Sequence, residues 1–280
     1  MSASPLTLFI TGVSSGFGKE LARLALAEGH RVVGTVRQES AVAAFEAEAP
    51  GRAFARVLDV TDTDAVFATV AEVESSVGAI DALVNNAGYG LEGLIEETAI
   101  DELRRQFDTN VYGAVAMMQA VLPFMRARRA GRILNITSMA GHTTFPGLGF
   151  YHGSKFALEG ISETLGKEVK HLGIFVTAVA PGGFRTDWAG RSMIRAERKI
   201  ADYDELFDPL RKARRERSGK QVGDPTKAAR AMLTLIAAEN PPAHLLLGSD
   251  AWARVSEKIA ALQADMAAWK ALTLSTDATD

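Results

Sequence analysis

The stretch Thr11-Gly12-Val13-Ser14-Ser15-Gly16-Phe17-Gly18 is a glycine-rich turn between a predicted strand and a predicted helix. Residues 6–11 form a short apolar run, and residues 17–28 repeat apolar side chains at helical spacing. Strand, glycine turn and helix form the arrangement that binds a dinucleotide, because glycines allow the tight turn and let backbone N–H groups approach a pyrophosphate. Alone this is weak evidence, since three residues separate Gly12 from Gly16, unlike the commonest fingerprint.

Strands and helices alternate along the rest of the chain as well. Apolar runs that suit buried parallel strands occupy residues 6–11, 31–36, 54–58, 80–84, a run ending at Ser138, 174–180 and 244–247. The alternation predicts an α/β fold, a Rossmann-type doubly wound parallel sheet of about seven strands with helices on both faces. Such sheets bind ligands in a crevice at the carboxyl ends of their strands.

Length and composition indicate one ordinary globular domain. The 280 residues are 47% hydrophobic and 23% charged, with a net charge of −3, which gives no reason to expect a nucleic-acid partner. We expect a single dinucleotide-binding catalytic domain over residues 1–280. Because there is no cysteine, there is no disulfide and no thiolate metal site. Neither a signal-peptide pattern nor a membrane-length apolar run is present, so we expect a cytoplasmic protein without a membrane partner.

The segment Phe150-Tyr151-His152-Gly153-Ser154-Lys155 opens a helical pattern that continues through Leu165. Tyr151 and Lys155 are four residues apart and therefore lie on the same helix face. A neighbouring positive charge favours the phenolate, and lowering a tyrosine pKa by about 3 units requires roughly 4 kcal/mol, which one lysine and a cationic cofactor could supply. The alternative is an ordinary helix pair in which the lysine stem packs along the ring.

Further motifs accompany this pair. Asn135-Ile136-Thr137-Ser138 closes one strand-like run, and Asn85-Asn86-Ala87-Gly88 follows another. Together with the glycine turn, Tyr151 and Lys155, they resemble the short-chain dehydrogenase/reductase family in its single-domain branch, over residues 6–247. The chain is most similar to bacterial relatives of 17β-hydroxysteroid and retinol dehydrogenases.

The resemblance implies a catalytic tetrad of Asn110, Ser138, Tyr151 and Lys155, with no metal needed. Asn110 falls inside a predicted helix over residues 101–129, where an asparagine suggests a kink or a held water. The resemblance makes it the anchor of a proton relay to Lys155. The alternative is a buried asparagine whose amide is satisfied by protein groups.

The family pattern also implies the cofactor contacts. They fall on Gly12, Ser14, Ser15, Gly16, Phe17, Gly18, Arg37, Asp59, Val60, Asn86, Ala87, Gly88, Tyr151, Lys155, Pro181, Gly182, Phe184 and Thr186. Asp59 is assigned to the adenine amino group, or else serves as a turn residue before a helix with Thr61 and Asp64 at its N-cap and N3 positions.

Arg37 decides the expected form of the cofactor. Related NAD enzymes usually carry an acid at the end of the second strand, where this chain has Val36 followed by Arg37. A guanidinium offers bidentate hydrogen bonds to a 2′-phosphate, whereas a carboxylate would repel it, so NADP(H) is favoured over NAD(H). Alternatively Arg37 is a surface residue and Glu39 serves the ribose. Ser15 argues slightly against NADP, because some NADP-preferring relatives place a basic residue there.

Residues 187–219 break the strand–helix rhythm and are interpreted as a substrate lid. Their basic run, residues 211–217, is interpreted as a solvated helix face, with a phosphate-binding patch as the alternative. Phe184 precedes the lid where a smaller residue is more common, and its ring either presses on the nicotinamide or narrows the pocket. The expected substrate contacts are Ser138, Met139, Phe145, Phe150, Tyr151, Trp188 and Met193, most of them apolar.

These features predict an NADP(H)-dependent oxidoreductase that interconverts a ketone or aldehyde with an alcohol, with Tyr151 as general acid/base. The alternatives are a non-enzymatic NADP(H)-binding redox sensor and an NAD-dependent alcohol dehydrogenase of the same fold. His142 and His152 flank the site and are interpreted as bystanders. The resemblance implies a homodimer or homotetramer. An extra amphipathic helix over residues 250–272 packs either on its own core or on a neighbouring subunit.

Overall fold

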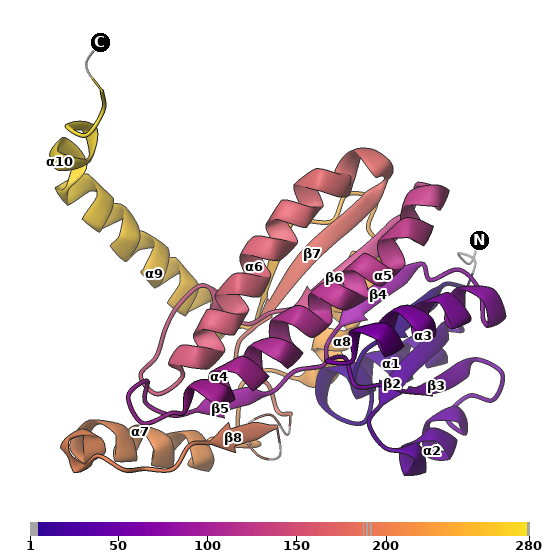
Figure 1. The fold of residues 1–280 in the computed structure, drawn as a ribbon, viewed down its shortest axis with the longest axis horizontal. Helices are drawn as coiled ribbons and strands as arrows, with labels where there is room; N and C mark the ends of the chain where they lie inside the picture. The colour runs from indigo at the N-terminus through magenta and orange to yellow at the C-terminus, as the bar shows by residue number, and fades with distance from the viewer. Residues whose placement is uncertain (1–4, 187, 189, 191, 279–280) are drawn as a thin grey trace.

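A seven-stranded parallel sheet forms the centre of the computed structural model, which describes residues 5–186, 188, 190 and 192–278 (Figure 1). The strand order is β3-β2-β1-β4-β6-β7-β9, and every neighbouring pair is parallel. The strands are β1 (Thr7–Ile10), β2 (Arg31–Val36), β3 (Ala53–Val57), β4 (Ala82–Asn85), β6 (Gly131–Ile136), β7 (Ile174–Pro181) and β9 (His244–Leu247). The predicted Rossmann-type fold is thereby confirmed.

Helices cover both faces of the sheet and enclose two hydrophobic cores. One core lies beneath α1 and α8 and includes Leu21 and Met232, and the other lies beneath α3 and α5 and includes Val66 and Met117. The helices are α1 (Gly16–Ala27), α2 (Val42–Glu46), α3 (Thr63–Ser76), α4 (Ile100–Phe107), α5 (Gly113–Arg128), α6 (Gly149–Val169), α7 (Asp204–Glu216), α8 (Pro225–Ala237), α9 (Ser249–Ala268) and α10 (Lys270–Leu274). Short 3₁₀ turns are η1 (Glu39–Ala41), η3 (Met139–Gly141), η4 (Lys170–Leu172) and η6 (Ala201–Tyr203).

The strand register brings the carboxyl ends of the central strands to one edge. Ile10 pairs with Val84, Asn85 with Asn135, and Ile136 with Val179. The strand order reverses beside β1, and ligands of open α/β sheets bind at such a switch point. The segments that follow β1, β4, β6 and β7 therefore converge there.

The predicted helix over residues 101–129 is interrupted in the middle. A π-helical turn, η2 (Asp108–Tyr112), separates α4 from α5 and contains Asn110. A π turn inserts an extra residue into the helical ladder and is frequent at functional sites. The helical ladder is therefore irregular at Asn110, the position for which the sequence suggested a kink or a held water.

Two local details differ from the sequence predictions. The N-cap of α3 is Asp62, whose carboxylate accepts a hydrogen bond from the Ala65 N–H at 3.0 Å, and not Thr61. A second, two-stranded parallel sheet pairs β5 (Gly90–Glu92) with β8 (Met193–Arg195). Three-residue strands are too short to produce a recognisable period in the sequence.

The predicted lid is an ordered arm in its described part, whereas residues 187, 189 and 191 lie outside the described residues. It runs through β8 and η6 into α7. Glu92 of β5 anchors the arm: its side chain is 1% exposed and lies 3.0 Å from Arg195, 3.5 Å from Arg211 and 3.1 Å from Arg214.

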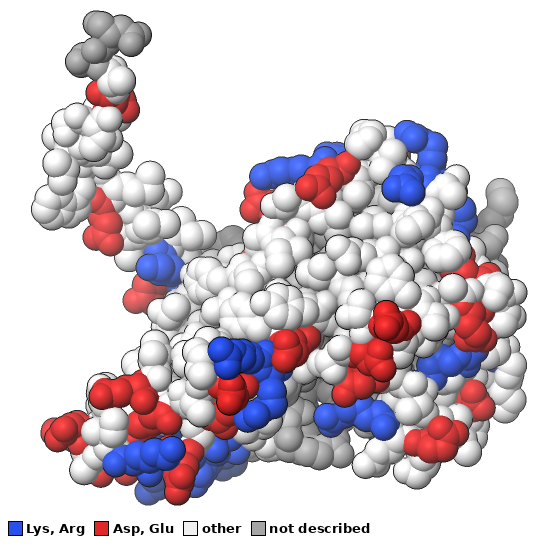
Figure 2. Space-filling model, viewed as in Figure 1, with Lys and Arg blue, Asp and Glu red and all other residues white. Residues whose placement is uncertain are grey.

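The prediction that the basic run, residues 211–217, forms a purely solvated helix face is therefore wrong. Arg211 and Arg214 turn inward to Glu92, while Lys212, Arg215 and Arg217 are exposed. Figure 2 shows side chains of both charges interspersed over this arm.

The C-terminal helix leaves the body of the protein after its first turns (Figure 1). Ala251 and Val255 of α9 are buried, whereas Trp252, Met266 and Trp269 are each more than 60% exposed. Beyond its first turns this segment does not pack on its own core. No helix in the described part of the chain is both long and apolar enough to cross a membrane.

Candidate active site

Tyr151 and Lys155 lie in the first half of α6 and are both buried, with 5% and 7% of their surfaces exposed. The Lys155 Nζ donates a hydrogen bond to the Ile136 carbonyl oxygen at 2.7 Å, which fixes the ammonium at the end of β6. The same Nζ lies 5.8 Å from the centroid of the Tyr151 ring. The two side chains that the sequence places on one helix face therefore share one site at the carboxyl edge of the sheet.

Burial dominates the protonation of this pair in the ligand-free chain. Desolvation raises the pKa of Tyr151 to about 12, and a hydrogen bond with the Ser138 side chain only partly opposes it. Desolvation lowers the pKa of Lys155 to about 8, partly opposed by the charge of Glu159. Lys155 alone therefore does not lower the pKa of Tyr151, and the expected lowering requires the cationic cofactor as well.

Ser138 lies between Tyr151 and the end of β7. It is the N-cap of η3, where its Oγ accepts a hydrogen bond from the Ala140 N–H at 3.1 Å. The same Oγ is 3.5 Å from the Pro181 carbonyl oxygen. A hydroxyl held by the turn on one side and by Tyr151 on the other is placed to donate to an oxygen beside the phenol.

Asn110 is 2% exposed, and protein groups satisfy its amide. The Oδ1 accepts a hydrogen bond from the Tyr89 N–H at 3.1 Å, and the Nδ2 donates to the Tyr89 carbonyl oxygen at 3.0 Å and to Ser154 Oγ at 3.2 Å. These contacts match the alternative of a buried, satisfied asparagine. They also tie the π turn to the helix that carries Tyr151 and Lys155.

The glycine turn after β1 has the backbone geometry that a phosphate cradle requires. Gly12 and Gly16 have φ of 74° and 59°, a region that favours glycine. A Cβ on Gly18 would lie 2.2 Å from the Gly12 carbonyl oxygen, so only glycine lets α1 pack this closely. Among the described side chains none caps the N-terminus of α1, whose first-turn N–H groups are therefore available to an anion.

Asn86 braces this turn from the neighbouring strand. Its Nδ2 donates to the carbonyl oxygens of Thr11 and Gly12, both at 2.9 Å. Thr11 Oγ1 accepts hydrogen bonds from the N–H groups of Asn86 and Ala87, also at 2.9 Å. The side chain of Asn86 is thus structural, and Thr11 is a positioning residue that sequence reasoning missed because a threonine at a strand end has no distinctive pattern.

Three further predicted cofactor residues follow the carboxyl ends of strands in the sheet: Arg37 after β2, Asp59 after β3 and Thr186 after β7. Arg37 directly follows β2 and is exposed, as a ligand of a 2′-phosphate must be. Asp59 Oδ1 accepts hydrogen bonds from the Thr61 N–H at 3.0 Å and the Thr61 hydroxyl at 2.8 Å, which is the turn role foreseen as its alternative. A Cβ on Gly16 would lie 3.9 Å from Thr186 Cβ, so the segment after β7 borders the glycine turn.

The ring of Phe184 lies away from the apolar cluster around Tyr151. The ring packs edge-on against Phe17, with centroids 5.1 Å apart, and belongs to the core beneath α1 and α8. It therefore neither joins the apolar cluster around Tyr151 nor narrows a pocket there.

Only some of the predicted substrate residues lie together in the structure. Tyr151 belongs to an apolar cluster and lies 5.2 Å, centroid to centroid, from Trp188. The cluster also contains Ala140, Phe145, Leu148 and Met193. Met139 and Phe150 are partly exposed and lie outside it.

Comparison with known proteins places this geometry in a family. Residues 7–195 match the family model of the short chain dehydrogenases. The 3-ketodihydrosphingosine reductase of Bacteroides thetaiotaomicron is 38% identical over 87% of this chain and 88% of its own, and human retinol dehydrogenase 8 is 38% identical over 72% and 66%.

Two solved structures show the same fold. A short-chain dehydrogenase from Streptomyces avermitilis superposes with a TM-score of 0.92 at 38% identity, covering 99% of this chain and 100% of its own. ElxO with NADP bound superposes with a TM-score of 0.72 at 26% identity, covering 86% and 96%. The chain belongs to the short-chain dehydrogenase family, and its class of activity is that of an NAD(P)-dependent oxidoreductase.

Proposed function

We propose that this chain is an NADP(H)-dependent oxidoreductase that interconverts a ketone or aldehyde with the corresponding alcohol. The observation that carries the proposal is the convergence of Tyr151, Ser138 and Lys155 at the carboxyl edge of the sheet, beside a glycine turn with uncapped helix N–H groups. Bound NADPH would supply the hydride to the carbonyl carbon. The chain itself then has to supply a proton and stabilise the developing alkoxide.

Tyr151 is the proton donor in the reducing direction. Because burial keeps its phenol protonated, it can donate to an oxygen next to it, and Ser138 donates a second hydrogen bond to the same oxygen. Lys155, held by the Ile136 carbonyl, supplies positive charge that stabilises the phenolate left behind. Asn110 holds the π turn against α6 through its hydrogen bond to Ser154.

An apolar substrate is supported by the side chains around Tyr151. The cluster of Leu148, Trp188 and Met193 offers no charged group to a ligand. Two of the relatives are named as a 3-ketodihydrosphingosine reductase and a retinol dehydrogenase, which act on a keto group and on an alcohol. We therefore expect a carbonyl attached to a predominantly apolar chain or ring.

The test is turnover of NADPH by the purified protein with a panel of apolar ketones and aldehydes, for wild type and Tyr151→Phe. We expect the variant to bind NADPH as wild type does and to lose roughly 10²–10⁴-fold in kcat. Turnover that survives in Tyr151→Phe would contradict the assignment. Binding of NADPH without turnover of any substrate by wild type would favour the redox-sensor alternative.

A homodimer or homotetramer is the second part of the proposal. It is supported by the exposed apolar side chains of the C-terminal segment, between which Figure 2 shows only scattered charged side chains. The large exposed apolar residues there are Trp252, Ile259, Leu262, Met266, Trp269, Leu272 and Leu274. Such a surface is unusual for a monomer. Sedimentation velocity tests it: a monomeric wild type would refute it, and we expect Met266→Glu with Trp269→Glu to reduce the assembly.

A further inference from the structure

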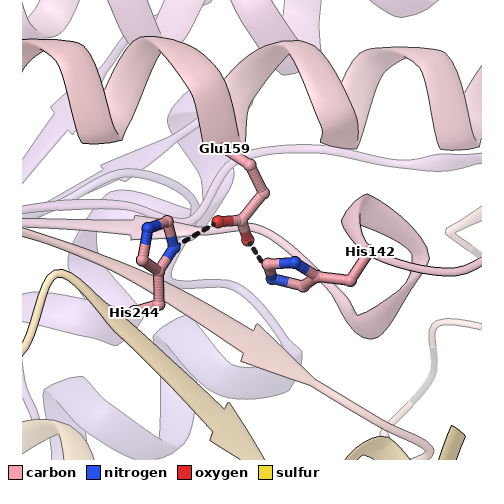
Figure 3. A group of neighbouring side chains, drawn as sticks. All are labelled: His142, Glu159 and His244. Atoms are coloured by element: carbon pink, nitrogen blue, oxygen red, sulfur yellow. Dashed lines mark hydrogen bonds and ion pairs between the residues drawn. The ribbon is translucent and has the colours of Figure 1, made fainter. Parts of the chain in front are cut away.

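Three side chains with metal-ligating atoms converge at α6, one helical turn beyond Lys155 (Figure 3). His142 directly follows η3, Glu159 lies one helical turn beyond Lys155 on α6, and His244 opens β9. One nitrogen from each histidine and a carboxylate oxygen lie within 4.8 Å of one another. Within the part of the chain that the structure describes, this is the one group of at least three such residues that meets this condition.

Glu159 is the centre of the group and is almost fully buried. Its side chain is 7% exposed, against 24% for His142 and 37% for His244. Glu159 Oε2 lies 2.9 Å from His244 Nδ1, in hydrogen-bond geometry. Glu159 Oε1 lies 3.1 Å from His142 Nε2, within ion-pair distance. A buried carboxylate between two imidazole rings needs positive charge, which protonated histidines or a bound cation can supply.

The donor set selects the kind of cation. Two imidazole nitrogens and one carboxylate oxygen form the three-ligand set of open zinc sites, whereas magnesium and calcium require oxygen donors. Ligand atoms about 2.0–2.2 Å from a tetrahedral metal are about 3.3–3.6 Å apart. The 2.9 Å and 3.1 Å separations, each to a different oxygen of Glu159, are shorter than that spacing by roughly 0.2–0.7 Å, so the side chains must open slightly to hold a metal.

A carboxylate outside the group supports the orientation of one ligand. Glu163 Oε2 lies 3.6 Å from His244 Nε2, the ring nitrogen that points away from Glu159. A histidine that binds a metal through one nitrogen almost always donates its other N–H to such a partner. Glu163 also pairs with Lys167 at 2.6 Å on the exposed surface of α6.

We propose that His142, Glu159 and His244 form a binding site for one divalent cation of the zinc type, with the fourth position open to water. The site is separate from the hydride-transfer chemistry and does not depend on the proposed function. The metal links η3, α6 and β9, the elements that position Ser138, Tyr151 and Lys155 and close the edge of the sheet. Its effect is to stabilise the folded chain.

The experiment measures Zn²⁺ binding to the full chain by equilibrium dialysis, and Co²⁺ binding by visible absorption. The variants are His142→Gln, Glu159→Gln and His244→Gln, and the control is His171→Gln, an exposed histidine on η4. We expect one Zn²⁺ per chain, a Co²⁺ spectrum of low coordination number and a higher Tm with Zn²⁺. Each cluster variant should weaken binding at least tenfold, and the control should not.

The alternative is that the three residues form only an ion-paired cluster that pins β9 to α6. Absence of stoichiometric Zn²⁺ binding, or binding that survives unchanged in all cluster variants, would overturn the proposal in favour of that cluster. Glu159 is buried and its replacement can disturb folding, so His244→Gln, on a partly exposed edge residue, keeps the test decisive. Glu163→Gln should weaken Zn²⁺ binding by at most about 100-fold without abolishing it, because Glu163 contacts a ligand and not the metal.

Discussion

Lys155 follows Tyr151 by one helical turn, but its ammonium is hydrogen-bonded to the Ile136 carbonyl at 2.7 Å and stands 5.8 Å from the phenol ring centroid. Burial raises the pKa of Tyr151 to about 12. The phenol is therefore protonated at neutral pH, which suits reduction. Oxidation of an alcohol requires the phenolate and hence a further positive charge.

A cationic cofactor should supply that charge. We expect NADP⁺ to lower the pKa of Tyr151 well below its ligand-free value, because the oxidised nicotinamide is positive and lies beside the phenol in the proposed complex. The measurement is a phenolate difference titration in the near ultraviolet, wild type minus Tyr151→Phe, with and without NADP⁺. NADPH, whose nicotinamide is neutral, is the control and should shift the pKa less. Equal shifts with both cofactors would contradict the role of nicotinamide charge.

Lys155 should reduce the stability of the protein at neutral pH. Its pKa falls to about 8 on folding, from 10.5, because its charged form is desolvated. Below pH 8 the lysine is protonated in both the folded and the unfolded chain, and the folded chain pays the desolvation free energy of the buried ammonium. Between pH 8 and 10.5 the unfolded chain binds more protons than the folded chain, so the free energy of unfolding rises with pH. Tyr151 acts oppositely at higher pH: between its ordinary value of 10 and about 12 the folded state holds the extra proton and stability falls.

Lys155→Met should therefore unfold at a higher temperature than wild type at pH 7. The expected gain in the free energy of unfolding is about 1–3 kcal/mol, once the loss of the hydrogen bond to Ile136 is subtracted. The difference should shrink as the pH rises from 8 towards 10. Turnover should be lost at every pH. Thermal unfolding at several pH values checks this, and a variant that is less stable than wild type at pH 7 would show that the ammonium is not desolvated as described.

Arg37 should determine the choice between NADPH and NADH. A guanidinium that binds a 2′-phosphate contributes about 1.5–3 kcal/mol, so Arg37→Ala should raise the KM for NADPH roughly 10–100-fold and leave that for NADH nearly unchanged. Lys19→Ala, an exposed cation on α1, serves as the charge-matched control. A wild type that clearly prefers NADH would refute the interpretation of Arg37.

The fold and the placement of Tyr151 beside Lys155 were predictable from sequence because they rest on local signals. Apolar runs and glycines define the strands and the turn, and four-residue spacing places Tyr151 beside Lys155. The orientation of Phe184 and the inward turn of Arg211 depend on packing between distant segments, which no local period reports. The same holds for Glu159, whose neighbours His142 and His244 lie 17 and 85 residues away in the sequence.

Glu92 should control how the arm over residues 192–219 closes on the site. Its carboxylate is 1% exposed and pairs with Arg195, Arg211 and Arg214. Breaking a buried ion pair by removing one partner costs about 3–5 kcal/mol, because it leaves uncompensated charge. Glu92→Gln removes the charge but not the shape, so the arm should detach more readily from β5.

We expect Glu92→Gln to raise the KM for carbonyl substrates more than it lowers kcat, and to speed cleavage of residues 192–219 in limited proteolysis. Affinity for NADPH should stay close to that of wild type, because the ion pairs of Glu92 hold the arm and not the glycine turn. Glu216→Gln is the matched control: this exposed glutamate of α7 lies 3.9 Å from Lys212, and exposed pairs of this kind contribute little. If both variants behaved alike, the arm would be held by its apolar contacts, of which Phe207 is the most deeply buried, and the ion pairs of Glu92 would only orient it.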